Sequence, residues 1–270
     1  MTCKTTILQM CAALAVLASL AGCGQAPLLP ADPGGSSELV TPSDEPEARR
    51  RARLRLELAV GYFEQGQTGV ALDELKQVIA LDPTFAEAHN LRGLIAMRLN
   101  DGRGAEDAFN RALAISPRDP NVRHNLGWLM CQQGRYADAN VQFEAAMANP
   151  TYGSRAKTLM TQGLCQARAG QFAEAERTLA RSFELDAANP VTGYNLAALL
   201  FRRGEYARAQ FYVRRLNNSE LANAESLWLG IRIERKLDNR DAVAQLADQL
   251  RKRFPQSREA AAFERRAFDE

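Results

Sequence analysis

Apolar and polar positions alternate along most of the chain with the spacing of amphipathic helices, and the whole pattern returns about every 34 residues. A small residue marks each return: Ala71, Ala105, Ala139, Ala175, Ala209 and Ala242. Twelve positions before each of these lies a second small residue: Ala59, Gly93, Gly127, Gly163, Ala197 and Gly230. Two helices approach within about 8–10 Å only where their crossing points carry small residues. The pattern therefore predicts stacked helical hairpins and favours a binding scaffold over a catalytic domain.

We place six hairpin repeats at 52–85, 86–119, 120–155, 156–189, 190–222 and 223–256. Most of the turns inside them carry the glycine that suits a helix C-terminus, as in Gln133-Gly134-Arg135. A final helix over 257–268, with Ser257 as its N-cap, is expected to cover the last repeat. No run of alternating β-branched residues competes with this reading. The predicted fold is an all-α, right-handed α-solenoid over 49–270.

The second repeat shows best that the pattern resembles the tetratricopeptide repeat. Gly93 and Ala105 allow its helices to approach, Phe109 fills the space between them, Ala112 lets the next hairpin stack, and Pro117 ends the second helix. The resemblance extends over nearly all of the chain after the N-terminal segment. It implies a solenoid of about six tetratricopeptide repeats with a C-terminal cap helix, acting through protein–protein contacts.

The N-terminal segment has the composition of an export signal. Residues 7–20 are an apolar run, too short to cross a bilayer comfortably. Leu20-Ala21-Gly22-Cys23 resembles the bacterial lipobox, which implies a lipoprotein signal peptide at 1–22 and lipid on Cys23, with palmitate among its acyl chains. A free cysteine beside an ordinary cleavage site is the alternative. Gly24, in place of Asp, implies export to the outer membrane, where the lipid anchors the protein facing the periplasm.

Residues 23–48 are expected to form a disordered tether, because five prolines and a Gly-Gly-Ser-Ser stretch cannot build a core. Five arginines follow within 49–55. They fit either the solvated face of the first helix or a contact with membrane phosphates. The formal net charge of +2 argues neither for nor against an acidic partner.

Catalytic and metal-binding signatures are missing from the sequence. It contains no phosphate-binding glycine loop, no His-Glu-x-x-His and no Cys-x-x-Cys pair. His89 occupies a position that suits a packing residue. His124 and Cys131 are two helical turns apart, about 10.8 Å, which is too far for a nucleophile pair within one helix. We expect no enzyme activity, metal, cofactor, small-molecule substrate or nucleic acid.

Cleavage after residue 22 would leave Cys131 and Cys165 as the cysteines of the folded part. They lie one repeat apart in neighbouring first helices. In an oxidising compartment they could form a disulfide, or they could be two small buried hydrophobic residues. The sequence leaves these alternatives open.

The first helix of each hairpin is expected to line an inner groove with apolar and aromatic side chains, edged by arginines. Such a surface suits an extended peptide or a helix of a partner protein. An alternative partner mode uses the convex or end surface of the first repeats. The predicted groove residues are Leu56, Val60, Phe63, Asn90, Leu94, Met97, Arg98, His124, Trp128, Met160, Leu164, Arg168, Tyr194, Phe201, Arg202 and Arg235.

Four local strings resemble the PilF/PilW family of type IV pilus biogenesis lipoproteins: 124–131, 163–165, 225–232 and 250–255. Both cysteines lie in these strings. The resemblance implies a pilotin, a protein that binds the secretin subunit of the type IV pilus and promotes its outer-membrane localisation and multimer assembly. Pilus biogenesis and twitching motility would depend on it. The alternative is another envelope adaptor, serving outer-membrane protein assembly, the cell wall or polysaccharide export.

Overall fold

The structure is a computed structural model that describes residues 45–268. The predicted signal peptide, the Cys23 lipidation site and nearly all of the predicted tether lie outside the described residues. The described residues from Pro46 onward form one compact unit. Among the described residues, none of the helices combines the length and the apolar character needed to span a membrane.

Thirteen helices and no strands make up the described residues, which confirms the all-α prediction. Their bounds are α2 Glu47–Glu64, α3 Thr68–Leu81, α4 Ala86–Arg98, α5 Gly102–Ile115, α6 Pro120–Gln132, α7 Tyr136–Met147, α8 Arg155–Arg168, α9 Phe172–Leu185, α10 Pro190–Arg202, α11 Tyr206–Asn217, α12 Ala224–Lys236, α13 Arg240–Arg253 and α14 Arg258–Glu264. The first helix begins at Glu47, so the last two residues of the predicted tether are helical.

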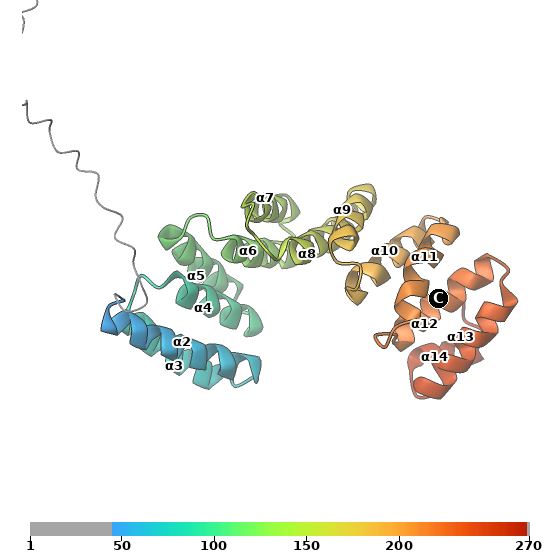
Figure 1. The fold of residues 1–270 in the computed structure, drawn as a ribbon, viewed down its shortest axis with the longest axis horizontal. Helices are drawn as coiled ribbons and strands as arrows, with labels where there is room; N and C mark the ends of the chain where they lie inside the picture. The colour runs from blue at the N-terminus through green and yellow to red at the C-terminus, as the bar shows by residue number, and fades with distance from the viewer. Residues whose placement is uncertain (1–44, 269–270) are drawn as a thin grey trace, which may run out of the picture. The chain divides into compact units, whose positions relative to one another are not determined.

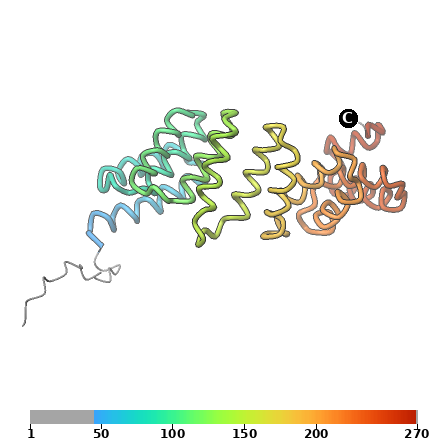
Figure 2. Tube along the Cα trace, turned by 90° about the horizontal axis from the view of Figure 1, so that it is seen from above, coloured from blue at the N-terminus to red at the C-terminus, as the bar shows by residue number. Residues whose placement is uncertain are grey.

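Consecutive helices form antiparallel pairs, from α2 with α3 to α12 with α13. Each pair packs against the next in chain order, as the ribbon and the tube views of residues 46–268 show (Figures 1 and 2). The first helices of successive pairs also contact one another, whereas within 45–268 the second helices of successive pairs do not. The first helices therefore lie on the inner side of the stack, where the pairs are closest.

The close approach of the paired helices depends on glycines at their crossings. A Cβ added to Gly127 would lie 2.9 Å from the Phe143 ring, and one added to Gly163 would lie 2.7 Å from the Leu179 side chain. Phe143 and Leu179 are fully buried. The large residue on the second helix thus occupies the space that a side chain on the first helix would need.

The turns inside the pairs share one backbone conformation. Gly66, Gly134, Gly170 and Gly204 all have a φ of 78°, in the left-handed region that favours glycine. Asn100 and Asp238 take the equivalent places with φ of 60° and 54°. Asparagine and aspartate tolerate this region better than other side chains do. The same turn geometry is therefore kept in the repeats that lack glycine there.

The C-terminal helix is shorter than the predicted 257–268. Ser257 caps it by accepting a hydrogen bond from the Ala260 amide, but α14 ends at Glu264. The chain then turns through Arg266, which has a φ of 56°. This turn brings Phe268 onto Trp228, with ring centroids 5.4 Å apart and the rings stacked. The left-handed turn at Arg266 ends the helix and allows the half-buried ring to pack against the last pair.

Candidate functional site

The predicted groove residues lie on the inner first helices, and nearly all of them reach the surface. Half-buried side chains make up most of the set: Leu56, Phe63, Asn90, Leu94, Met97, Trp128, Met160, Leu164, Tyr194 and Phe201. Val60 is exposed, and the four predicted arginines reach solvent as well. The inner side is thus a mainly apolar surface with cationic groups along it. These features suit a protein segment that supplies both apolar and acidic side chains.

The four arginines predicted to edge the groove each lie over an aromatic ring. Arg98 lies 3.7 Å from the centroid of Phe63, and Arg168 lies 5.0 Å from that of Trp128. The other two pairs are Arg202 over Phe172, at 4.8 Å, and Arg235 over Phe268, at 3.7 Å. Each of these arginines is in the last turn of its first helix. The rings hold the charged groups in fixed places while leaving them in contact with solvent.

His124 is the predicted groove residue that the structure places in the interior. It is 7% exposed, and its Nδ1 lies 2.8 Å from the Thr158 hydroxyl. Thr158 is 2.9 Å from the Tyr152 hydroxyl, so three buried polar groups form a chain. Burial, followed by the positive charge of Lys157, lowers the pKa of His124 to about 4. The imidazole is therefore neutral at pH 7, and its contacts make it a structural residue.

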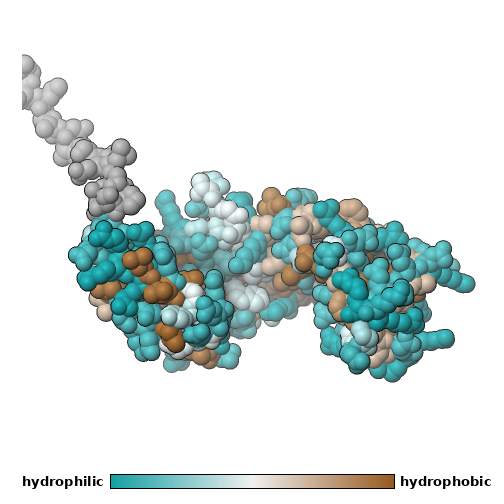
Figure 3. All heavy atoms as spheres, turned by 60° about the horizontal axis from the view of Figure 1, so that its bottom comes forward, coloured by the Kyte–Doolittle hydropathy of each residue, from teal (hydrophilic) through white to brown (hydrophobic). Residues whose placement is uncertain are grey.

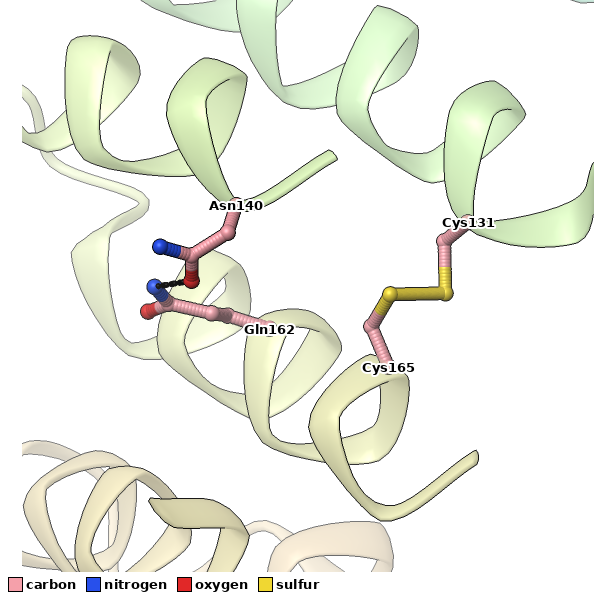
Figure 4. Close-up of a disulfide and its surroundings, with 4 residues drawn as sticks. All are labelled: Cys131, Asn140, Gln162 and Cys165. Atoms are coloured by element: carbon pink, nitrogen blue, oxygen red, sulfur yellow. Dashed lines mark hydrogen bonds between the residues drawn. A yellow bond between two sulfur atoms is a disulfide. The ribbon is translucent and has the colours of Figure 1, made fainter. Parts of the chain in front are cut away.

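A disulfide joins Cys131 of α6 to Cys165 of α8 (Figure 4). Their Cα atoms are 5.8 Å apart, within the range a disulfide accepts. Of the two alternatives that the sequence leaves open, the structure contains the bridge. Beside it, Gln162 of α8 donates hydrogen bonds of 2.7 Å to Asn140 and to Glu144 of α7. Covalent and polar contacts together fix the third repeat to the fourth.

A pocket of about 440 Å³, here called the terminal pocket, opens between α10, α12 and the C-terminal segment. Aromatic and charged side chains line it: Tyr194, Glu225, Trp228, Arg232, Arg258, Glu259 and Arg265, together with Leu229, Ala262 and Ala267. Arg258 pairs with both acids, at 2.8 Å from Glu259 and 3.3 Å from Glu225. Hydrogen bonding and charge attraction from Glu259, with a further contribution from Glu225, raise the pKa of the Arg258 guanidinium. Burial, assisted by the two glutamates, raises the pKa of Tyr194.

Of the residues that line this pocket, only Tyr194 belongs to the predicted groove. Trp228 and Arg232 lie four residues apart on one face of α12, a spacing that could have indicated a shared surface. The other lining residues could not be predicted because the path of the C-terminal segment does not follow from the repeat pattern. Arg265 comes after the last helix, and no periodicity shows that it lies beside α12.

The face of the described residues shown in Figure 3 is mainly hydrophilic, with separate apolar patches. One patch lies over the N-terminal helices (Figure 3). Leu54 and Leu58 of α2 are 57% and 53% exposed. Leu54 and Leu58 are one helical turn apart, so they form a short apolar stripe outside the predicted groove.

Tetratricopeptide repeat models match residues 56–120 and 96–163. The type IV pilus assembly protein PilF of Pseudomonas aeruginosa is 28% identical over 231 residues, which cover 86% of this chain and 90% of that protein.

Two solved structures extend the similarity to the fold. PilW, described as a widely conserved type IV pilus biogenesis factor, aligns with a TM-score of 0.71 at 28% identity and covers 78% of this chain and 97% of its own. The structure of Pseudomonas aeruginosa PilF gives a TM-score of 0.73 at 26% identity, over 81% of this chain and 99% of its own. The agreement therefore extends over most of the helix pairs.

Proposed function

Because the chain belongs to the PilF/PilW family of type IV pilus assembly proteins, a family of repeat scaffolds that are not enzymes, we propose that it is a pilotin. In this proposal Cys23 carries lipid that holds the protein at the outer membrane, facing the periplasm. The repeats bind the secretin subunit of the type IV pilus and promote its localisation and assembly into multimers. Pilus biogenesis and twitching motility depend on that assembly.

The observation that carries the proposal is the row of arginines stacked on rings along the inner helices. Stacking limits the freedom of a long side chain, so less entropy is lost when a partner binds. Trp128 lies under Arg168 and Phe201 lies under Arg232, and both rings are half-buried and pack against the core. Such partly buried aromatic residues are the side chains that most often dominate binding energy.

The proposal is tested with the purified chain and the purified secretin subunit of the same organism. Replacing Trp128 and Phe201 together with Ala is expected to weaken binding at least tenfold, because truncating a dominant contact residue costs about 2 kcal/mol or more. Phe211→Ala is the matched control, since Phe211 is an aromatic residue on a second helix and is 63% exposed. Unchanged affinity in the double variant would refute the groove as the binding surface.

The cellular role has its own readouts. Deleting the gene is expected to abolish secretin multimers and twitching, and Cys23→Ser is expected to prevent lipid labelling and move the protein away from the outer membrane. Intact secretin multimers in the deletion strain would contradict the pilotin role and would favour another envelope adaptor.

A further inference from the structure

We propose that the terminal pocket binds one acidic side chain of the partner segment, with its carboxylate held by Arg232 and Arg265. This inference rests on the proposed function and deepens it, since it names the chemistry that one end of the groove recognises. The pocket is formed by α10, α12 and the segment after α13. It therefore lies at the C-terminal end of the row of first helices.

The charges of the pocket leave a place for one anion. Its lining contains three arginines and two glutamates. Arg258 is engaged by both glutamates, whereas Arg232 and Arg265 form no ion pair within residues 45–268. The lining therefore has an excess of one positive charge. One carboxylate balances that excess, while a doubly charged phosphate would exceed it.

Arg232 is the strongest sign that the pocket is incomplete. The residue is half-buried, and its guanidinium lies 4.9 Å from the centroid of the Phe201 ring. Its Nε atom is buried and has no hydrogen-bond partner among the described residues. Burying part of a cation without a counter-ion is unfavourable, and such unsatisfied groups are rare in native proteins. A carboxylate beside the terminal nitrogens of this guanidinium would supply the missing charge.

The neighbouring side chains indicate what accompanies the acid. Trp228 is half-buried at the pocket and offers a ring surface, and Leu229 adds apolar contact. The Tyr194 hydroxyl makes no hydrogen bond within the described residues and can donate to a ligand oxygen. The pocket therefore fits a glutamate or aspartate next to an aromatic or large aliphatic residue. This chemistry favours a peptide segment over a lipid headgroup.

A pair of peptides tests the pocket without any assumption about the natural partner. The probes are the acetylated and amidated tetrapeptides Ala-Phe-Glu-Ala and Ala-Phe-Gln-Ala. Each is titrated into the isotopically labelled protein and followed by NMR spectroscopy. The readout is the indole N–H signal of Trp228, which Trp128→Phe distinguishes from the second tryptophan. We expect a saturable shift with the Glu peptide and at least fivefold weaker binding of the Gln peptide. Equal affinities for the two peptides would overturn the proposal.

Variants locate the effect. Arg232→Gln and Arg265→Gln are each expected to weaken binding of the Glu peptide at least fivefold, while Arg232→Lys keeps part of the affinity. Arg265 is exposed at the end of α14, so its replacement leaves the packing intact. Arg103→Gln, an exposed arginine on α5, is the control and should leave affinity unchanged. Unchanged binding in both pocket variants would refute the assignment.

Two further ligands separate the other sources of negative charge. If inorganic phosphate binds as tightly as the Glu peptide, the pocket recognises a phosphate group and not a carboxylate side chain, and the proposal is overturned. Arg232-dependent binding to phosphatidylglycerol vesicles would identify the pocket as a membrane contact and overturn the proposal as well.

The secretin subunit separates this inference from the proposed function. If the chain binds the Glu peptide through Arg232 but does not bind the secretin subunit, the pilotin role fails and the pocket remains. If the secretin subunit binds and Arg232→Gln and Arg265→Gln both leave its affinity unchanged, the pocket fails as a partner contact and the pilotin role remains.

Discussion

At the scale of single residues, Gly127 is conspicuous because its neighbour leaves no room for a methyl group. A Cβ there would lie 2.9 Å from Phe143 and 3.2 Å from the Ala139 carbonyl oxygen. Gly127→Ala is therefore expected to lower the free energy of unfolding by about 1–3 kcal/mol through overpacking. Gly61→Ala is the control, since a Cβ at this helical position meets nothing within 4 Å, and it should raise stability by up to about 1 kcal/mol. Urea unfolding measures both variants, and equal effects would contradict the packing argument.

His124 predicts a dependence of stability on pH. Its folded-state pKa of about 4 lies below the ordinary 6.5, so the unfolded chain binds the proton more readily. Above pH 6.5 the imidazole is neutral in both the folded and the unfolded chain, so its titration does not affect stability. As the pH falls from 6.5 towards 4, the unfolded chain takes up the proton and the free energy of unfolding decreases. At pH 5 this decrease is about 2 kcal/mol.

The variant His124→Asn isolates this contribution from other acid effects. Asparagine keeps a hydrogen-bonding group near Thr158 but does not titrate, so its stability should fall less than that of the native chain between pH 7.5 and 5. Denaturant unfolding at the two pH values gives the comparison. Parallel losses in the two proteins would show that His124 is not the titrating group.

At the scale of secondary-structure elements, the disulfide predicts how strongly two neighbouring pairs are joined. It links α6 to α8 across a sequence separation of 34 residues. A cross-link over this separation restricts the unfolded chain, which by loop entropy alone would stabilise the folded state by about 3–4 kcal/mol. Measured stabilisation is usually smaller than this value. The double variant Cys131→Ala/Cys165→Ala is expected to be less stable by roughly 2–4 kcal/mol. Reductant should destabilise the native chain and leave the variant unchanged.

Mass spectrometry of the unreduced protein checks the premise of that prediction. Alkylation under denaturing conditions should leave both cysteines unmodified, because a bridged thiol does not react. Uptake of alkylating agent by Cys131 and Cys165 would show two free thiols, and the stability difference would then need another cause.

At the scale of the whole described unit, much of the architecture could be predicted because repeated packing leaves a repeated pattern in the sequence. The crossings at Gly127 and Gly163 follow from the regular spacing of small residues alone. The prediction that His124 lines the groove is wrong because its position in the repeat suits the groove, whereas its side chain is buried against Thr158 of the next repeat. Periodicity shows which face a residue occupies on average, but it does not show individual hydrogen bonds.

The terminal pocket escaped prediction for a related reason. It needs the turn at Arg266, which has the left-handed φ of the turns inside the pairs but leads to Phe268 and, within residues 45–268, to no second helix. The contacts of Phe268 with Trp228 and Arg235 join residues that no spacing rule connects. Features that occur once in a repeat protein are the ones that a repeat pattern cannot indicate, and here they coincide with the pocket.

The C-terminal cap makes the last prediction, which concerns how stability is distributed along the stack. Phe263 and Phe268 pack with Trp228 against a core formed by Leu227, Ile231, Ala247, Leu250 and Ala260. In a solenoid each repeat contacts only its neighbours, so losing the cap affects the adjacent repeat most. Replacing Phe263 and Phe268 with Ala is expected to speed amide exchange in α12 and α13 at least tenfold. The disulfide-linked helices α6 and α8 should keep their protection, because five helices separate α6 from α12 and three separate α8 from it.

Hydrogen exchange followed by mass spectrometry resolves these segments. Equal acceleration in α6 and α12 would mean that residues 46–268 unfold as one cooperative unit, and the nearest-neighbour description would then be wrong for this chain.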